Sequence, residues 1–130
     1  YVVAQLMKQM KKRSIQIQGA RILVMGLTFK ENCPDLRNTR VVDVINGLVD
    51  YNCEVDVYDP WVKVEEAQSM FNIAMTESLN PGTYDSVILA TKHHQFEQMG
   101  ASFFRGLCKS DHIIYDLKYV LKLDESDLRL

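Results

Sequence analysis

Two cations and a carboxylate lie in one loop of the sequence, between an apolar run and an amphipathic stretch. The loop follows the strand-like run Arg21–Met25 and Gly26, and it holds Lys30, Asp35 and Arg37. Arginine offers a planar fork of donors that matches phosphate oxygens, whereas lysine acts as a mobile point charge. A long loop without secondary structure is usually functional or disordered. The loop is therefore a candidate site for an anionic ligand, with phosphate as the expected chemistry.

The same residues allow a second interpretation. The two cations could simply be solvated, or they could pair with Glu31 and Asp35 in the loop. Spacing alone leaves both interpretations equally open. Asp35 is expected to orient Arg37 or to cap the turn rather than to do chemistry.

The histidines and Asp59 have weaker support as functional residues. His93 and His94 are expected to be the polar start of a helix, because His112 is the only other histidine and a metal site needs more ligands. Asp59 stands where a ribose-binding acid could stand, but no glycine fingerprint precedes it. With Pro60, it is expected to end a strand and cap the next helix.

The glycines and cysteines also limit the chemistry. Gly26 stands alone, so the sequence lacks the GxGxxG turn that places a pyrophosphate on a helix N-terminus. Cys33 lies among cations that favour a thiolate, but no histidine is near it in sequence, so it is not expected to be a nucleophile. The three cysteines include no CxxC pair, which indicates reduced thiols and a cytoplasmic protein.

Apolar runs alternate with helical patterns, which predicts a parallel sheet with helices on both faces. The expected strands are Arg21–Met25, Glu54–Tyr58, Ile73–Met75, Ser86–Thr91 and His112–Tyr115. The expected helices are Thr39–Tyr51, Lys63–Phe71 and Gln95–Phe104, after a first helix that begins without a cap and should project from the domain. The fold class is therefore α/β, a three-layer Rossmann-like domain with a mainly parallel five- or six-stranded sheet. The tail from Lys122 to Leu130 is expected to pack as a short final element or to be mobile.

Bulk properties exclude two classes of partner. The 130 residues suffice for one domain with a single core. A net charge of -2 gives no basic field, which argues against nucleic acid as the main partner. No apolar stretch approaches the roughly 18 residues that a membrane helix needs.

The run GLTFKENCPDLRNT resembles the carboxy-terminal, UDP-binding domain of the UDP-glucose/GDP-mannose dehydrogenase family. The similarity continues through VDVYDP, YDSVILATKHHQF, IIYDLKYVL and DESDLRL, so it covers essentially the whole chain. The loop and the ending are most similar to the bacterial UDP-N-acetylhexosamine 6-dehydrogenases.

The resemblance implies both a domain division and a site. Residues 1–18 would be the end of a long inter-domain helix and a connection, and residues 19–130 the nucleotide-sugar-binding domain. Phe29, Lys30 and Lys118 would contact the UDP-sugar substrate, and Arg37 the cofactor NAD. The family commonly has arginine at the position of Lys118, so here the charge is kept and the bidentate fork is lost. The alternative for Lys118 is a solvated surface lysine.

The intact enzyme implied by the resemblance is an NAD-dependent homo-oligomer of polysaccharide biosynthesis. It would oxidise C6 of UDP-N-acetylhexosamine or UDP-glucose to the UDP-uronic acid in two hydride transfers. Its catalytic cysteine and main NAD fold would lie outside this chain, so the chain alone should be inactive and holds no expected catalytic residue. Two alternatives are a stand-alone nucleotide-binding or regulatory module and a receiver-like phosphorylation domain. The second needs clustered acids after the first strand, where Met25 and Gly26 stand.

Overall fold

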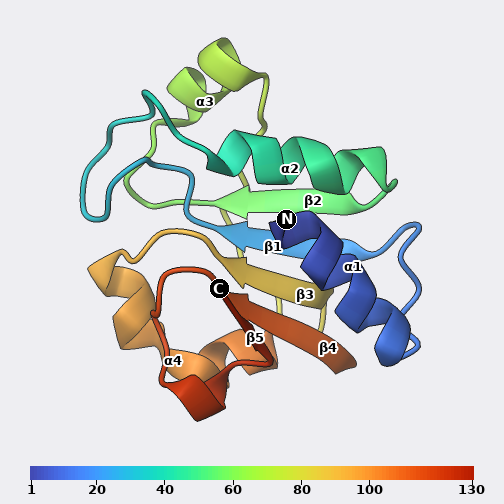
Figure 1. Ribbon diagram of the computed structural model, residues 1–130. Coiled ribbons are helices and arrows are strands. Elements are labelled where there is room, and N and C mark those ends of the chain that lie inside the picture. The colour runs from blue at the N-terminus through green and yellow to red at the C-terminus, as the bar shows by residue number, and fades with distance from the viewer.

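Five parallel strands form one sheet, in the order β2-β1-β3-β4-β5, in the computed structural model, which describes residues 1–130 (Figure 1). The strands are β1 (Arg21–Met25), β2 (Glu54–Tyr58), β3 (Tyr84–Leu89), β4 (Cys108–Asp116) and β5 (Leu128–Arg129). The helices are α1 (Val2–Lys12), α2 (Val41–Asp50), α3 (Val64–Phe71) and α4 (His94–Gly106), with a 3-10 turn η1 (Leu123–Glu125). The expected α/β fold with a parallel sheet is confirmed.

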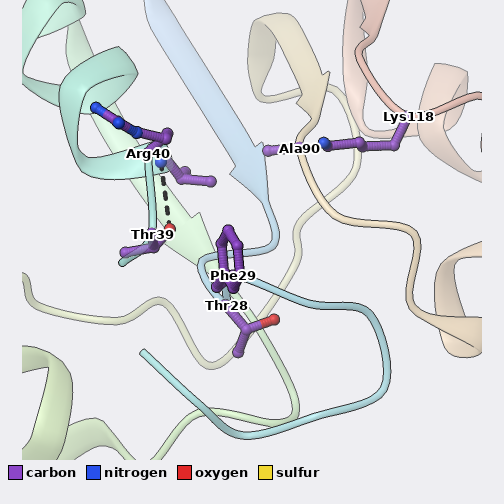
Figure 2. Close-up of a pocket in the computed structure, with 7 residues that line it drawn as sticks. Thr28, Phe29, Thr39, Arg40, Ala90 and Lys118 are labelled. Carbon is purple, nitrogen blue, oxygen red and sulfur yellow. Dashed lines mark hydrogen bonds between the residues drawn. The ribbon is translucent and has the colours of Figure 1, made fainter. Parts of the chain in front are cut away.

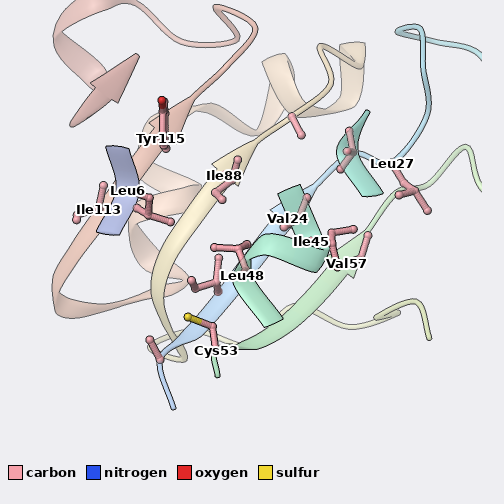
Figure 3. Packing of buried hydrophobic residues seen from close by; sticks show 14 of the residues in the cluster. Leu6, Val24, Leu27, Ile45, Leu48, Cys53, Val57, Ile88, Ile113 and Tyr115 are labelled. Carbon is pink, nitrogen blue, oxygen red and sulfur yellow. The ribbon is translucent and has the colours of Figure 1, made fainter. Parts of the chain in front are cut away.

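Two apolar clusters hold the helices against opposite faces of the sheet. Side chains alternate along a strand, so Ile22 and Val24 of β1 face one cluster while Leu23 and Met25 face the other. The first cluster includes residues of α1 and α2 (Figure 3), and the second includes Phe96 of α4. The central strands β1 and β3 are buried on both faces, as in other parallel sheets. The three-layer arrangement follows directly from this burial.

The first helix lies on the sheet instead of projecting from it, so that expectation is wrong. Leu6 and Met10 are completely buried and Met7 nearly so, within the cluster that also holds α2 (Figure 1). Val3 of α1 meets Gly47 of α2 so closely that a Cβ on Gly47 would lie 2.9 Å from Val3 Cγ2. The apolar stripe of α1 therefore finds its partner within this domain.

Several boundaries differ from those expected. The stretch Ile73–Met75 forms no strand but a single bridge between Met75 and Val57. β4 begins at Cys108 rather than His112, and β3 ends at Leu89, so Ala90 and Thr91 lie beyond the strand. The tail packs as η1 and β5, and β5 pairs with the end of β4. Pairing with a neighbouring strand, rather than local pattern, decides these ends.

Candidate functional site

The carboxyl ends of all five strands lie along one edge of the sheet. Between β1 and β3 the order in which successive strands are placed in the sheet reverses. After β1 the chain crosses to β2 on one side, while β3 lies on the other side of β1. In sheets of this order, ligands bind in the crevice at that reversal, outside the carboxyl ends of the strands. The loop predicted to bind an anion begins at this point.

Gly26 lets the ends of β1 and β3 approach closely. Its φ of +104° is a conformation that side chains disfavour, and a Cβ on it would lie 2.5 Å from Cβ and Oγ1 of Thr91. Its N–H donates to the carbonyl of Tyr58, at 2.8 Å, so it also joins the end of β2. Gly26 is thus needed for packing and turn geometry, not for a phosphate-binding fingerprint.

A cavity of about 100 Å³ opens at this reversal (Figure 2). It is lined by Thr28, Phe29, Thr39, Arg40, Val41, Ala90 and Lys118. The structure thereby brings together Phe29 and Lys118, two of the predicted site residues, from the ends of β1 and β4. Phe29 is half exposed, so its ring forms an accessible apolar wall. Arg40 was missed from the sequence, and only its place just before the first turn of α2 could have indicated it.

The start of α2 is tied to the loop that follows β1. Thr39 Oγ1 donates to the carbonyl of Leu27 at 2.7 Å and accepts from the N–H of Val41 at 3.2 Å. Arg40 is the residue that precedes the helix, so α2 begins at Val41 and not at Thr39 as expected. The Thr39 hydroxyl therefore ties the start of α2 to the segment after β1, and both of these segments line the cavity.

Lys30 and Arg37, the two cations of the loop, lie outside the cavity lining and differ in their surroundings. Lys30 is exposed and takes part in none of the ion pairs. Arg37 forms a fork with Asp35, with Nε to Oδ1 at 3.0 Å and an Nη nitrogen to Oδ2 at 3.1 Å. The bonds from Arg37 hold the pKa of the Asp35 carboxyl below its usual value. Asp35 thus orients Arg37, as expected, although the Arg37 side chain is 81% exposed.

Asp59, at the end of β2, is a buried junction between three chain segments. Its Oδ2 accepts from the N–H groups of Leu27 and Thr28, at 2.7 and 3.2 Å. Its Oδ1 accepts from the N–H of Trp61 at 2.9 Å and closes the turn after the strand. The residue that precedes α3 is Lys63, so the expectation that Asp59 caps this helix is wrong. The carboxylate instead holds the loop that follows β1.

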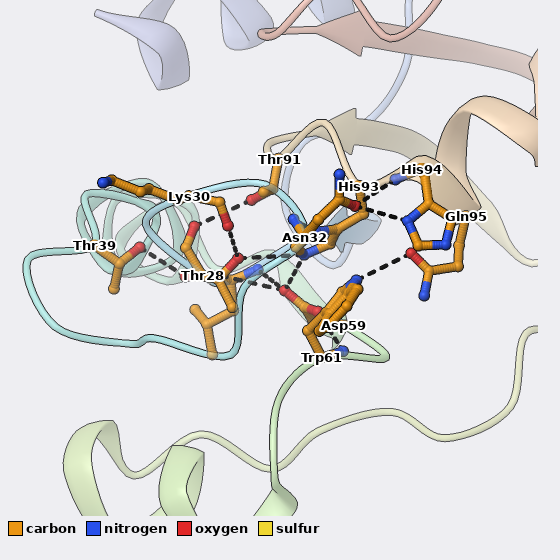
Figure 4. Close-up of polar contacts among 11 residues, drawn as sticks. Thr28, Lys30, Asn32, Thr39, Asp59, Trp61, Thr91, His93, His94 and Gln95 are labelled. Atoms are coloured by element: carbon orange, nitrogen blue, oxygen red, sulfur yellow. Dashed lines mark hydrogen bonds and ion pairs between the residues drawn. The ribbon is translucent and has the colours of Figure 1, made fainter.

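His93 completes this junction from the start of α4 (Figure 4). It precedes the helix as expected, yet its side chain is completely buried. Its Nε2 lies 3.0 Å from Asp59 Oδ2, and its Nδ1 accepts the N–H of Asn32 at 2.9 Å. Trp61 lies beside it with ring centroids 6.0 Å apart. The sequence could not reveal this junction, because its members come from three separate segments.

Asp116, at the end of β4, is a second buried carboxylate of the same edge. It accepts N–H bonds from Lys118 at 3.2 Å, Val120 at 3.1 Å and Leu121 at 2.8 Å. The turn also places Tyr119 at a φ of 58°. Asp116 therefore fixes the backbone of Lys118, whose ammonium is exposed and outside the ion pairs.

The cysteines show no arrangement typical of a nucleophile. All three thiols are free. Cys33 is half-buried and makes no side-chain hydrogen bond, and Cys108 is buried, which raises the pKa of its thiol to about 12. The arrangement at this edge is suited to binding and positioning rather than to covalent chemistry.

The profile of the UDP-glucose/GDP-mannose dehydrogenase family, UDP binding domain, matches residues 23–123. The chain belongs to this family. The matched region contains the cavity, the loop after β1 and Lys118, so the resemblance recognised in the sequence is confirmed. None of the helices combines the length and apolar character that crossing a membrane requires.

Individual relatives agree with the family. The UDP-N-acetyl-D-glucosamine 6-dehydrogenase of Pseudomonas aeruginosa is 55% identical over the whole chain, and that of Salmonella typhi is 48% identical. The chain spans 31% of the length of each. Among solved structures, the UDP-D-ManNAc dehydrogenase of Pyrococcus horikoshii superposes with a TM-score of 0.75 at 25% identity, over 94% of this chain and 27% of that one.

Proposed function

We propose that this chain binds the UDP portion of a UDP-N-acetylhexosamine within an NAD-dependent nucleotide-sugar 6-dehydrogenase. The observation that carries the proposal is the cavity at the reversal of the strand order, which Phe29 and Lys118 both line. Family membership gives the ligand class, and the relatives at 55% and 48% identity favour an N-acetylhexosamine over glucose. The whole enzyme would oxidise C6 of that sugar to the carboxylate, for polysaccharide biosynthesis.

Charge and shape at this edge suit a nucleoside diphosphate. Lys30 and Lys118 present ammonium groups outside every ion pair of the chain, so their charge is available to phosphate oxygens. The half-exposed ring of Phe29 offers a face against which a base or sugar can pack. The backbone of both lysine loops is fixed by buried carboxylates, so little order has to be gained on binding.

The contribution of these residues to the reaction is positional. By holding the diphosphate, they would present C6 of the sugar in a productive orientation and exclude water from it. Holding two reactants in the right geometry can supply a large part of a catalytic rate enhancement. The chain itself has no arrangement for nucleophilic attack, so on its own it should produce no NADH.

The residues present fit an edge contact with NAD rather than its main binding site. Gly26 lacks the companion glycines of a pyrophosphate turn, whereas Arg37 is exposed and oriented by Asp35. Arg37 would hold the dinucleotide, which when bound supplies the hydride acceptor. We place the intact enzyme in the cytoplasm, where its free thiols stay reduced, and expect it to be a homo-oligomer.

The experiment that tests the proposal compares the intact enzyme on two substrates. We expect a higher kcat/KM for UDP-N-acetylglucosamine than for UDP-glucose, followed by NADH formation. Phe29→Ala and Lys118→Ala should each raise the KM for the sugar, and Thr83→Val, in an exposed turn at the opposite edge, should not. A clear preference for UDP-glucose would mean that the enzyme is a UDP-glucose 6-dehydrogenase and not a UDP-N-acetylhexosamine 6-dehydrogenase. UDP binding without any dehydrogenase activity would favour a separate binding module.

A further inference from the structure

The backbone around Lys30 is fixed by a buried histidine that no ligand can touch. His93 has no exposed surface, and its ring packs edge-on against Phe96, with centroids 5.2 Å apart. Both ring nitrogens nevertheless contact polar groups: Nδ1 the N–H of Asn32 in the loop, and Nε2 the carboxylate of Asp59 at the end of β2 (Figure 4). A buried polar network of this kind is costly unless every group is satisfied.

The hydrogen-bond partners assign the tautomer of His93. The N–H of Asn32 can only donate, and it lies 2.9 Å from Nδ1, so Nδ1 carries a lone pair. The ring proton of the neutral imidazole is therefore on Nε2, which donates to Asp59 Oδ2 at 3.0 Å. Nδ1 thus holds the loop at Asn32, after Lys30, while Nε2 anchors the ring to Asp59 and lies 3.2 Å from Thr28 Oγ1, before Lys30.

The loop is held on both sides of Lys30. Before it, Thr28 Oγ1 donates to the carbonyl of Lys30 at 2.8 Å and lies 3.2 Å from His93 Nε2. After it, Asn32 donates its N–H to His93 and accepts the N–H of His94 on its side-chain oxygen at 2.8 Å. Asn32 adopts a φ of 55°, a conformation that local sequence alone would populate weakly. The Lys30 side chain itself remains exposed and unpaired.

We propose that His93 is a positioning residue for substrate binding, which acts by holding the 28–32 loop so that Lys30 meets the diphosphate of the UDP-sugar. This inference rests on the proposed function, because it takes Lys30 to be a ligand of the nucleotide sugar. Nδ1 is the nitrogen that matters for binding, since it alone contacts the loop backbone after Lys30.

Two amide substitutions separate the tasks of the nitrogens in the intact enzyme. In His93→Asn, the side-chain oxygen can replace Nδ1 as the acceptor for Asn32, although the contacts of Nε2 with Asp59 and Thr28 are lost. In His93→Gln, the amide can reach Asp59 in place of Nε2, but nothing accepts the N–H of Asn32. Thr28→Val removes the hydroxyl that holds the carbonyl of Lys30 and keeps the shape of the side chain.

We expect His93→Gln and Thr28→Val to raise the KM for UDP-N-acetylglucosamine about two- to tenfold, the size of one lost hydrogen bond. The KM for NAD should stay unchanged, and His93→Asn should recover most of the sugar KM. Hydrogen exchange at the Asn32 amide should accelerate in His93→Gln and stay slow in His93→Asn. His112→Gln is the control, because it removes a histidine contact with Arg105 at the opposite edge of the sheet.

The outcomes separate this inference from the proposed function. If Lys30→Ala leaves the sugar KM unchanged, the assignment of Lys30 fails whatever His93 does. If Lys30→Ala raises that KM but His93→Gln and Thr28→Val match His112→Gln, the positioning role of His93 is wrong. Equal losses in His93→Gln and His93→Asn, in sugar KM and in exchange, would also overturn the role of Nδ1. If the His93 variants do not fold, the KM for the sugar is compared between Thr28→Val and Thr83→Val. A higher KM in Thr28→Val alone supports the positioning of Lys30 by the loop, and equal KM values contradict it.

Discussion

At the edge where the strands begin, part-buried carboxylates pair with side-chain cations, whereas at the edge where the strands end the two fully buried carboxylates, Asp59 and Asp116, lie among N–H donors. At the first edge, Arg105 and Asp127 lie 2.7 Å apart, and Lys109 lies 3.1 Å from Asp85. At the second edge, Asp59 and Asp116 accept mainly backbone N–H bonds. Lys30 and Lys118, at this second edge, are consequently left without an anionic side chain as a partner.

This difference shows how a domain of net charge -2 can still offer a cationic surface to an anion. Total charge does not decide the local field; what matters is which groups neutralise the acids. Where N–H groups satisfy a carboxylate, no lysine or arginine has to pair with it, and the cation stays available to a ligand. The edge with free lysines is also the one where the sheet reverses and the cavity opens.

The largest effect should come from removing a carboxylate at the ligand edge. Asp59→Ala leaves the N–H groups of Leu27, Thr28 and His93 without their acceptor in a buried place. We expect the free energy of unfolding to fall by on the order of 3–5 kcal/mol, measured by urea denaturation. Asp85→Ala, at the other edge, should cost less, about 1–2 kcal/mol, because its partner lysine is half exposed and only one backbone N–H, that of Arg21, loses its acceptor. Equal losses would remove the distinction between the edges.

Lys30→Ala tests whether the unpaired charge serves a ligand. In the intact enzyme, loss of a bond to a charged phosphate is worth about 1.5–3 kcal/mol, so kcat/KM for the UDP-sugar should fall on the order of tenfold to a hundredfold. The KM for NAD should remain nearly unchanged. Steady-state kinetics with each substrate varied in turn provide the measurement. Normal kinetics in a folded variant would mean that the lysine is merely solvated.

Arg37→Ala should show the opposite pattern, with a weaker NAD interaction and little change for the sugar. The expected loss in kcat/KM for NAD is again on the order of tenfold to a hundredfold. Arg37→Lys should recover only part of it, because an ammonium cannot form the bidentate fork. In Asp35→Asn the charge of Arg37 stays while its orienting partner weakens, so a smaller loss is expected. An unchanged KM for NAD in Arg37→Ala would remove Arg37 from the site.

The smallest effect concerns the ion pairs of the opposite edge. Burial alone would raise the pKa of Asp127, but the bonds from Arg105 and from the N–H of Ile114 leave it below the ordinary value of 3.8. A carboxyl whose pKa is lowered by folding stabilises the native state above its unfolded pKa, and this stabilisation disappears as the pH falls through the folded pKa. Arg105→Gln should therefore cost about 1 kcal/mol at neutral pH and progressively less below pH 3.8. Urea titrations at several pH values measure this, and a loss independent of pH would contradict it.

The sequence predicted what local pattern and the geometry of parallel sheets determine. β1 and β2 have the expected bounds, because β1 is an apolar run stopped by Gly26 and β2 is an alternating polar and apolar run stopped by Asp59 and Pro60. The presence of Phe29 and Lys118 in one cavity also follows, since the ends of parallel strands share one edge.

What the sequence could not predict depends on partners distant along the chain. The burial of His93 requires Asn32 and Asp59, which are separated from it by 61 and 34 positions. The docking of α1 requires α2 to present Gly47 to it. β5, with only two residues, exists because the end of β4 offers it a ladder. No periodicity in a single sequence encodes such pairings.

Trp61 lies at the edge where the strands end and makes that edge detectable by tryptophan fluorescence. It is the only tryptophan of the chain, its Nε1 donates to Gln95 at 3.0 Å, and its ring lies about equally far from those of His93 and His94. The whole intrinsic indole emission of this domain therefore originates beside the loop that carries Lys30. Changes at the opposite edge occur far from the fluorophore, so this domain carries its own reporter for the edge of the sheet that is proposed to bind the nucleotide sugar.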